Sequence, residues 1–120
     1  MSMRAIRGAI QVPANTPADI AAGVQELVSA ILDANDLTPA QVISVFFTST
    51  VDLNAAFPAA ACREMGFANV PLIGSVEVDV PGALDKTIRA MFHVETARSA
   101  EQVSHIYLHG AAALRRDIAQ

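Results

Sequence analysis

The sequence predicts an α+β fold, in which a long helix packs against a β-sheet. Segments rich in β-branched and aromatic residues recur along the chain, and several are bounded by proline or glycine turns. Between the first two of these segments, apolar residues repeat at helical spacing over four turns. The 120 residues suffice for one hydrophobic core, so we expect a single domain over residues 1–120.

Composition and charge argue against several classes of protein. A formal net charge of −4 provides no basic surface to neutralise phosphates, so we expect no nucleic-acid partner. No apolar run reaches the roughly 18 residues of a membrane span, and the single cysteine cannot form an internal disulfide. We therefore expect a cytoplasmic protein that does not enter the membrane. Because 52% of the residues are hydrophobic, we also expect an oligomer that buries the excess apolar surface.

The first half of the chain is predicted to form a strand, a helix and a second strand. Residues 3–12 are typical of a strand, in which Gly8 would let another backbone or a ligand approach closely. Thr16 is placed as a helix N-cap, with Pro17 at the first helical position and an apolar stripe after it. Residues 42–50 are β-branched and aromatic, which predicts a central strand.

The second half is predicted to contain a short helix followed by three strands. The helix starts at Pro58 and stops at Gly66. The strands cover residues 72–80, 88–94 and 102–108, and a short helical turn follows them near the C-terminus.

Glu77 and Arg89 lie on two of these strands, which a short turn at Pro81 and Gly82 connects. The pattern therefore places an anion and a cation on adjoining elements. Such a pair is either a surface ion pair or part of a binding site, and the spacing alone leaves both interpretations open.

Arginine is the dominant cation, with seven arginines against one lysine. Its rigid fork binds a carboxylate through two parallel hydrogen bonds, as a site for a small dianion would require. Genomic base composition is the alternative explanation for this ratio. Arg7 lies on the first predicted strand, where it faces either water or a polar pocket on the sheet.

Histidine and cysteine provide no pattern for a metal site or a nucleophile. His105 and His109 could share a strand face, but no third ligand has suitable spacing. Cys62 has no histidine beside it in sequence, so we expect a buried thiol. No catalytic base with a partner is evident, and we expect no metal.

Several fragments, taken in order, resemble one family of small enzymes. They are I-R-G-A at 6–9, D-L-N-A-A-F-P-A at 52–59, Arg63, the block from V-P-L to I-R at 70–89, H-I-Y-L at 105–108 and L-R at 114–115. Their order, spacing and total length resemble the monofunctional chorismate mutases that form trimers of the pseudo-α/β-barrel class. The resemblance covers nearly the whole chain.

This resemblance implies a fold and a reaction. The fold would be a mixed β-sheet with helices packed on one face, in a homotrimer that forms a pseudo-α/β barrel with active sites at subunit interfaces. The reaction would be the intramolecular [3,3] rearrangement of chorismate to prephenate, in the synthesis of phenylalanine and tyrosine. It requires no cofactor and no metal.

The resemblance also implies roles for individual residues. As catalytic residues, Arg89 would lie at the ether oxygen, Arg7 would bind a substrate carboxylate and Glu77 would accept the hydrogen of the ring hydroxyl. The residues implied in substrate binding are Phe57, Ala59, Arg63, Ile73, Gly74, Tyr107, Leu114 and Arg115.

Three positions depart from the family pattern. Gly74 stands where a relative can have a cysteine or another small polar residue, Ala60 where a lysine can occur, and Arg116 where a proline is usual. These departures alter the charge at the mouth of the implied site. Two alternatives share the implied architecture: proteins resembling the reactive-imine deaminases, and small-anion-binding modules without a reaction.

Overall fold

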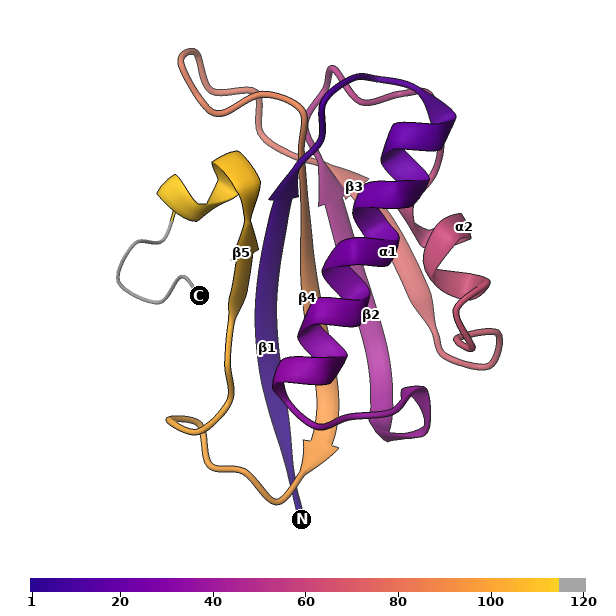
Figure 1. The fold of residues 1–120 in the computed structure, drawn as a ribbon, viewed down its shortest axis with the longest axis vertical. Helices are drawn as coiled ribbons and strands as arrows, with labels where there is room; N and C mark the ends of the chain where they lie inside the picture. The colour runs from indigo at the N-terminus through magenta and orange to yellow at the C-terminus, as the bar shows by residue number, and fades with distance from the viewer. Residues whose placement is uncertain (115–120) are drawn as a thin grey trace.

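The computed structural model describes residues 1–114, which form a five-stranded sheet, two α-helices and two 3₁₀ turns (Figure 1). The strands are β1 (Ser2–Gln11), β2 (Val42–Ser49), β3 (Leu72–Val76), β4 (Thr87–Thr96) and β5 (Ile106–Leu108). The helices are α1 (Pro17–Ala34) and α2 (Pro58–Arg63), and the 3₁₀ turns are η1 (Pro39–Gln41) and η2 (His109–Ala113). Within this part of the chain, no helix is long and apolar enough to cross a membrane.

The sheet is mixed, and its strands follow the order β3-β2-β4-β1-β5. Strand β4 pairs antiparallel with β1 and β2, whereas β5 runs parallel to β1 and β3 runs parallel to β2. Both α-helices lie on the same side of the sheet and contribute to one hydrophobic core (Figure 1). The predicted α+β class, with a mixed sheet and helices on one face, is confirmed.

Helix α1 begins where its capping residues predict. The Thr16 hydroxyl accepts a hydrogen bond from the backbone N–H of Asp19 at 3.0 Å, and Pro17 occupies the first helical position. The helix buries one stripe of residues against the sheet: Ile20, Gly23, Val24, Leu27, Val28 and Ile31. This stripe covers one side of the sheet and forms the centre of the core.

No α-helix of residues 1–114 covers the other side of the sheet, which we call the open face; only η2 packs there, where Ala111 contacts Ala9 and Tyr107. Ile6 and Ile10 of β1 point into the core, so alternation sends Arg7 to the open face. The same alternation and the strand pairing place Ser44, Phe46, Thr48, Arg89, Met91 and His93 there. The open face therefore combines charged, polar and apolar side chains.

The close approach predicted at Gly8 is confirmed. Gly8 pairs with Ile106 of β5, and a Cβ atom at Gly8 would lie 3.0 Å from the Ile106 carbonyl oxygen. The same Cβ would lie 2.8 Å from Cδ1 of Ile31 on α1. Glycine thus lets α1 and β5 pack closely on β1.

The strand predicted over residues 72–80 is shorter than expected, because β3 ends at Val76. Its partner β2 ends at Ser49, whose carbonyl oxygen accepts one last hydrogen bond from the Glu77 N–H at 2.9 Å. Val78 and Val80 have no strand to pair with, and they are 85% and 55% exposed. The prediction that Glu77 lies inside a strand was wrong: β-branched composition indicated a strand where the partner strand had already ended.

The strand predicted over residues 102–108 also begins later, at Ile106. Side chains take the hydrogen bonds that a strand ladder would otherwise make. The ring Nδ1 of His105 accepts from the Arg7 backbone N–H at 2.9 Å, and the Asn35 side chain accepts from the Ser104 N–H at 2.7 Å. These side-chain contacts hold residues 104–105 against the edge of the sheet, although the two residues are not part of a strand.

Candidate active site

A depression of about 500 Å³ lies on the open face, where β1, β2 and β4 run side by side. It is lined by Arg7, Gly8, Phe46, Thr48, Arg89, Ala90, Met91, His93 and Tyr107. Arg7 pairs with Met91 and Ala9 pairs with Arg89, so the two arginines are diagonal neighbours on the same face. The sheet itself therefore places two cations beside one apolar surface.

Arg89 forms an ion pair with Glu77. Its Nε–H donates to both carboxylate oxygens of Glu77, at 3.2 Å for Oε1 and 3.1 Å for Oε2. The Glu77 side chain is only 16% exposed, whereas that of Arg89 is 45% exposed. Within residues 1–114 the Arg89 guanidinium uses only Nε in hydrogen bonds, so its two terminal nitrogens are available for a ligand.

The pair joins β4 to the residue after β3, and these two strands are consecutive in the chain, as predicted, but are not neighbours in the sheet. Strand β2 lies between β3 and β4, and the pair forms across it. Thr48 of β2 lies beneath this contact and donates its hydroxyl hydrogen to Oε2 of Glu77 at 2.7 Å. Thr48 is not among the site residues predicted from the sequence, and its contact with the ion pair follows from the strand order.

Arg7 is fixed through its backbone and not through its side chain. Its N–H donates to His105, and its guanidinium has no hydrogen-bonding partner within residues 1–114. Tyr107 lines the same depression and is buried against Ala9 and Ala111, with Leu114 packed on this cluster. Arg7, Tyr107 and Leu114 thus belong to one neighbourhood, as their predicted roles require.

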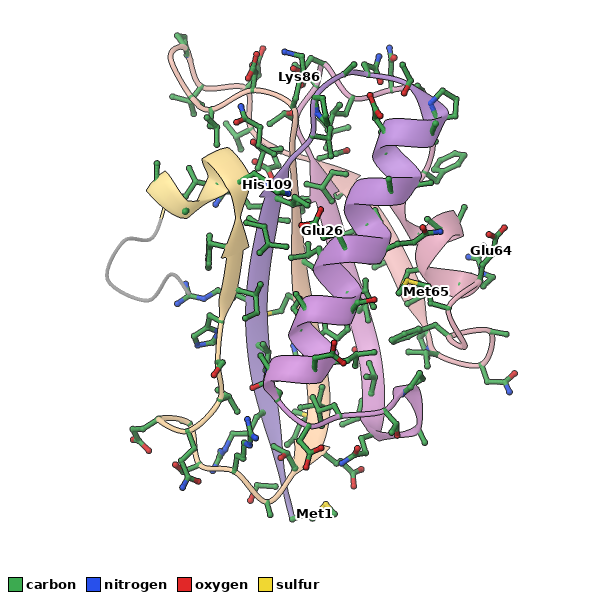
Figure 2. The ribbon with its side chains drawn as sticks, viewed as in Figure 1. Met1, Glu26, Glu64, Met65, Lys86 and His109 are labelled. Atoms are coloured by element: carbon green, nitrogen blue, oxygen red, sulfur yellow. The ribbon has the colours of Figure 1, made fainter. Side chains whose placement is uncertain are left out.

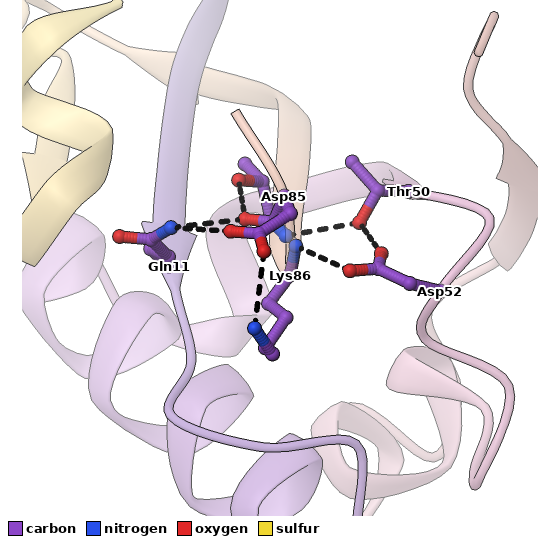
Figure 3. Close-up of polar contacts among 6 residues, drawn as sticks. Gln11, Thr50, Asp52, Asp85 and Lys86 are labelled. Carbon is purple, nitrogen blue, oxygen red and sulfur yellow. Dashed lines mark hydrogen bonds and ion pairs between the residues drawn. The ribbon is translucent and has the colours of Figure 1, made fainter. Parts of the chain in front are cut away.

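A polar network anchors the loop that connects Glu77 to Arg89 (Figure 3). The Gln11 side-chain amide donates to Oδ1 of Asp85 at 3.0 Å and to its backbone oxygen at 3.1 Å. The hydrogen bond and the charge of Lys86 lower the pKa of the Asp85 carboxyl. The network therefore ties the end of the loop to the end of β1.

The same network also ties the loop to the end of β2. Oδ2 of Asp52 accepts from the Lys86 backbone N–H at 3.0 Å, while the Thr50 hydroxyl donates to Oδ1 of Asp52 (Figure 3). Lys86 adopts a φ of +46°, a left-handed conformation that these contacts stabilise. Strand β4 begins at the next residue, so the network sets where Arg89 enters the sheet.

A second group of predicted site residues lies at the other edge of the sheet, between α2 and β3. A depression of about 340 Å³ there includes five of them: Phe57, Ala59, Arg63, Ile73 and Gly74. Phe57 is 82% exposed and Ile73 is 55% exposed, which leaves an apolar wall without a cover within the described residues. One chain therefore presents the predicted site residues as two separate groups.

The family model for chorismate mutase type I matches residues 3–118 of this chain. The chain belongs to the chorismate mutase type I family. It is 41% identical over 117 residues to chorismate mutase AroH of Thermus thermophilus, a match that covers 97% of this chain and 96% of the relative. It is 38% identical over 119 residues to chorismate mutase AroH of Bacillus subtilis, covering 98% and 94%.

A solved structure supports the same relationship. The chorismate mutase from Clostridium thermocellum superposes with a TM-score of 0.90 at 44% identity, covering 92% of this chain and 98% of that one. The resemblance read from the sequence is therefore confirmed, and so is the isomerase class that it implied. Neither the deaminase nor the non-catalytic alternative gains support from these matches.

Not every residue that the chorismate mutase resemblance implied can be placed. Arg115 lies outside the described residues, and so does the departure at Arg116. Gly74 contributes no side chain to the β3 depression, and Ala60 lines that depression without a charge. Within residues 1–114, the cations among the predicted site residues are therefore Arg7, Arg89 and Arg63.

Two of the histidines make side-chain contacts, and the cysteine is buried. Nε2 of His109, at the start of η2, hydrogen-bonds to Oε2 of Glu26 on α1 at 2.9 Å, and Figure 2 shows the two residues on these elements. His93 contacts the Ser44 hydroxyl at 3.2 Å on the open face. Among residues 1–114 no group of three potential ligands could hold a metal ion. Cys62 is buried as predicted, and burial raises the pKa of its thiol to about 12.

Proposed function

We propose that this protein is a chorismate mutase that rearranges chorismate to prephenate in aromatic amino-acid biosynthesis. The observation that carries this proposal is the Arg89–Glu77 pair on the open face, in a chain of the chorismate mutase family. The pair orients a guanidinium through Nε and leaves its terminal nitrogens for a substrate oxygen. Arg7 supplies a second cation on the same face, which suits a dianion.

The proposed mechanism needs only positioning and charge. A pericyclic step requires a flexible dianion held in a compact conformation, and positive charge beside the ether oxygen as the C–O bond breaks. Arg89 would stabilise that oxygen, Arg7 would hold a carboxylate and Glu77 would accept the ring hydroxyl. A rate acceleration of about 10⁶ corresponds to ~8 kcal/mol, which positioning and electrostatic stabilisation can supply together.

We also propose that each active site forms between two subunits of a homotrimer. The cationic group on β1 and β4 and the apolar group on α2 and β3 lie apart in one chain. Phe46 on the open face is 49% exposed, an apolar surface that a second subunit would cover. A neighbour that presents its Phe57 wall to this face would complete the site.

A cytoplasmic location forms part of the proposal. Cys62 is a free thiol buried in the core, which suits a reducing compartment. Cell fractionation with an antibody to the protein is expected to place it with cytoplasmic markers, and its recovery with an exported fraction would contradict this assignment.

The direct test of function is an assay with purified protein and chorismate. The ultraviolet absorption of chorismate is expected to disappear, and proton NMR should identify prephenate, an isomer of equal mass. The Arg89→Ala variant serves as the control for a contaminating enzyme. Wild-type protein that leaves chorismate unchanged would overturn the proposed function.

The test of the shared site combines two inactive variants. Arg89→Ala disables the cationic group, and Phe57→Asp places a negative charge on the exposed apolar wall, where it repels the dianion. Equal amounts of the two variants are mixed. If two subunits build each site, about a quarter of the sites in random mixed trimers are intact, because each half of a site is unmutated with a probability of one half. Mixed trimers confirmed by native mass spectrometry but without recovered activity would refute the shared site.

A further inference from the structure

Thr48 lies on the sheet between the two charged residues of the site. In the ladders of β2 it pairs with Arg89 of β4 on one side and with Ser75 of β3 on the other. Glu77 follows Ser75 by two residues, so it returns to the same face, and its N–H still bonds to β2. The side chains of Arg89 on β4, Thr48 on β2 and Glu77, the residue directly after β3, therefore lie in a row across the sheet.

The hydrogen bonds of Glu77 are distributed unequally between its two oxygens. Oε2 accepts from the Thr48 hydroxyl at 2.7 Å and from Nε of Arg89 at 3.1 Å, whereas Oε1 accepts only from Nε at 3.2 Å. A carboxylate oxygen has two lone pairs. Within residues 1–114, Oε2 is therefore filled, and Oε1 keeps one acceptor position for a ligand hydroxyl.

An ion pair alone would not fix this arrangement. Arg89 is 45% exposed, and exposed ion pairs hold their geometry weakly. The terminal torsion of a glutamate is broad, so the plane of the carboxylate could rotate against the guanidinium. The Thr48 hydroxyl comes from the interior strand β2 and bonds to one oxygen only, which selects a single orientation of the carboxylate.

We propose that Thr48 is a positioning residue for the reaction. Its hydroxyl fills Oε2 of Glu77, which directs Oε1 toward the substrate hydroxyl and holds the Arg89 guanidinium through Nε. The terminal nitrogens of Arg89 then face the ether oxygen. The catalytic part of this inference rests on the proposed chorismate mutase function, whereas the orientation of the carboxylate does not.

The kinetic test replaces Thr48 with residues of matched size. Thr48→Val removes the hydroxyl and keeps the β-branched shape, so kcat/KM is expected to fall about 10- to 100-fold, as for loss of a hydrogen bond to a charged group. The loss is expected mainly in kcat. Thr48→Ser keeps the hydroxyl and should stay within about threefold of the wild type. A Thr48→Val enzyme with wild-type kcat/KM would overturn the proposal.

A double-mutant cycle separates positioning from general damage to the fold. In a Glu77→Ala background, Thr48→Val should lower kcat/KM by no more than about twofold, because the carboxylate that it positions is gone. An equal loss in both backgrounds would show that Thr48 acts independently of Glu77, and the proposal would then be wrong.

A readout without substrate distinguishes failure of this inference from failure of the proposed function. The Nε–H resonance of Arg89 can be followed by ¹⁵N NMR in the wild type and in both variants. Its exchange with water is expected to accelerate in Thr48→Val and to return to the wild-type rate in Thr48→Ser. Equal exchange in all three proteins would overturn the positioning role even if the wild type converts chorismate.

Discussion

Arg89 bonds to Glu77 through its Nε–H alone, with both carboxylate oxygens within 3.2 Å of that nitrogen. A contact at Nε fixes the plane of the guanidinium and leaves its outer edge for another partner. The carboxylate therefore acts as a support for the cation, in addition to its proposed contact with the ring hydroxyl. Lysine has no counterpart of Nε, so it could not be held in this way.

This geometry makes Arg89 the most sensitive position of the site. Arg89→Ala is expected to lower kcat/KM by at least ~10², as for loss of one preorganised donor to a developing oxyanion. Arg89→Lys keeps the charge but should also lose activity strongly, because the fork and the Nε contact are both gone. Initial rates of chorismate loss measure both effects, and circular dichroism confirms the fold.

A substitution at Arg98 is the matched control for the substitutions at Arg89. It shows whether replacing any arginine lowers the activity, or only one at the candidate site. Arg98 donates to the Ala34 carbonyl oxygen at the end of α1 and does not line the open-face depression. Arg98→Lys is expected to keep kcat/KM within about twofold of the wild type, since surface substitutions rarely alter more than local stability. Near-normal turnover of folded Arg89→Ala would contradict the electrostatic account.

The starts of the helices could be predicted because they depend on residues close in sequence. The candidate site could be predicted only in part, because it also depends on the order of the strands. Thr16 and Pro17 begin α1 through contacts within three residues. The Glu77–Arg89 contact depends instead on the insertion of β2 between β3 and β4, which residue spacing does not reveal. The arginines and the glutamate could be named from their fragments, but the contact of Thr48 with Glu77 follows only from strand order.

The open face is expected to control assembly. Phe46 is 49% exposed among apolar and cationic neighbours, so Phe46→Glu would bury a charge if a second subunit covers it. Multi-angle light scattering should then report a smaller species than the wild type, with unchanged circular dichroism. Mass is the readout here because Phe46 also lines the depression.

The control for assembly places the same charge on the helical side of the molecule. Ser29 lies on the exposed side of α1, so Ser29→Glu should leave the mass unchanged. A wild-type protein that is monomeric at micromolar concentration and fully active would contradict both the trimer and the shared site.

Gly8 is expected to be important for stability, although it carries no side chain. Its missing Cβ leaves room for the Ile106 carbonyl at 3.0 Å and for Cδ1 of Ile31 at 2.8 Å. Gly8→Ala should reduce the free energy of unfolding by about 1–3 kcal/mol, measured by urea denaturation, because the backbone of β5 must shift. Gly74→Ala is the control, since its Cβ would meet nothing closer than the Phe47 carbonyl at 3.8 Å, and equal stability losses in the two variants would contradict this packing argument.

The buried thiol of Cys62 is expected to make the protein less stable at high pH. Burial raises its pKa from 9.0 to about 12, and the positive charge of Arg63 opposes part of that rise. Between pH 9 and 12 the unfolded chain loses the thiol proton while the folded chain keeps it, so rising pH favours unfolding in this window only. The free energy of unfolding should fall by up to about 1.4 kcal/mol per pH unit from this group, and below pH 9 its contribution is constant.

Other groups also titrate between pH 9 and 12, so urea denaturation of the Cys62→Ala variant at each pH provides the comparison. The variant is expected to start less stable, because it leaves a small cavity, but to decline with a shallower slope. Parallel slopes for the two proteins would show that the thiol is not protected in the folded state.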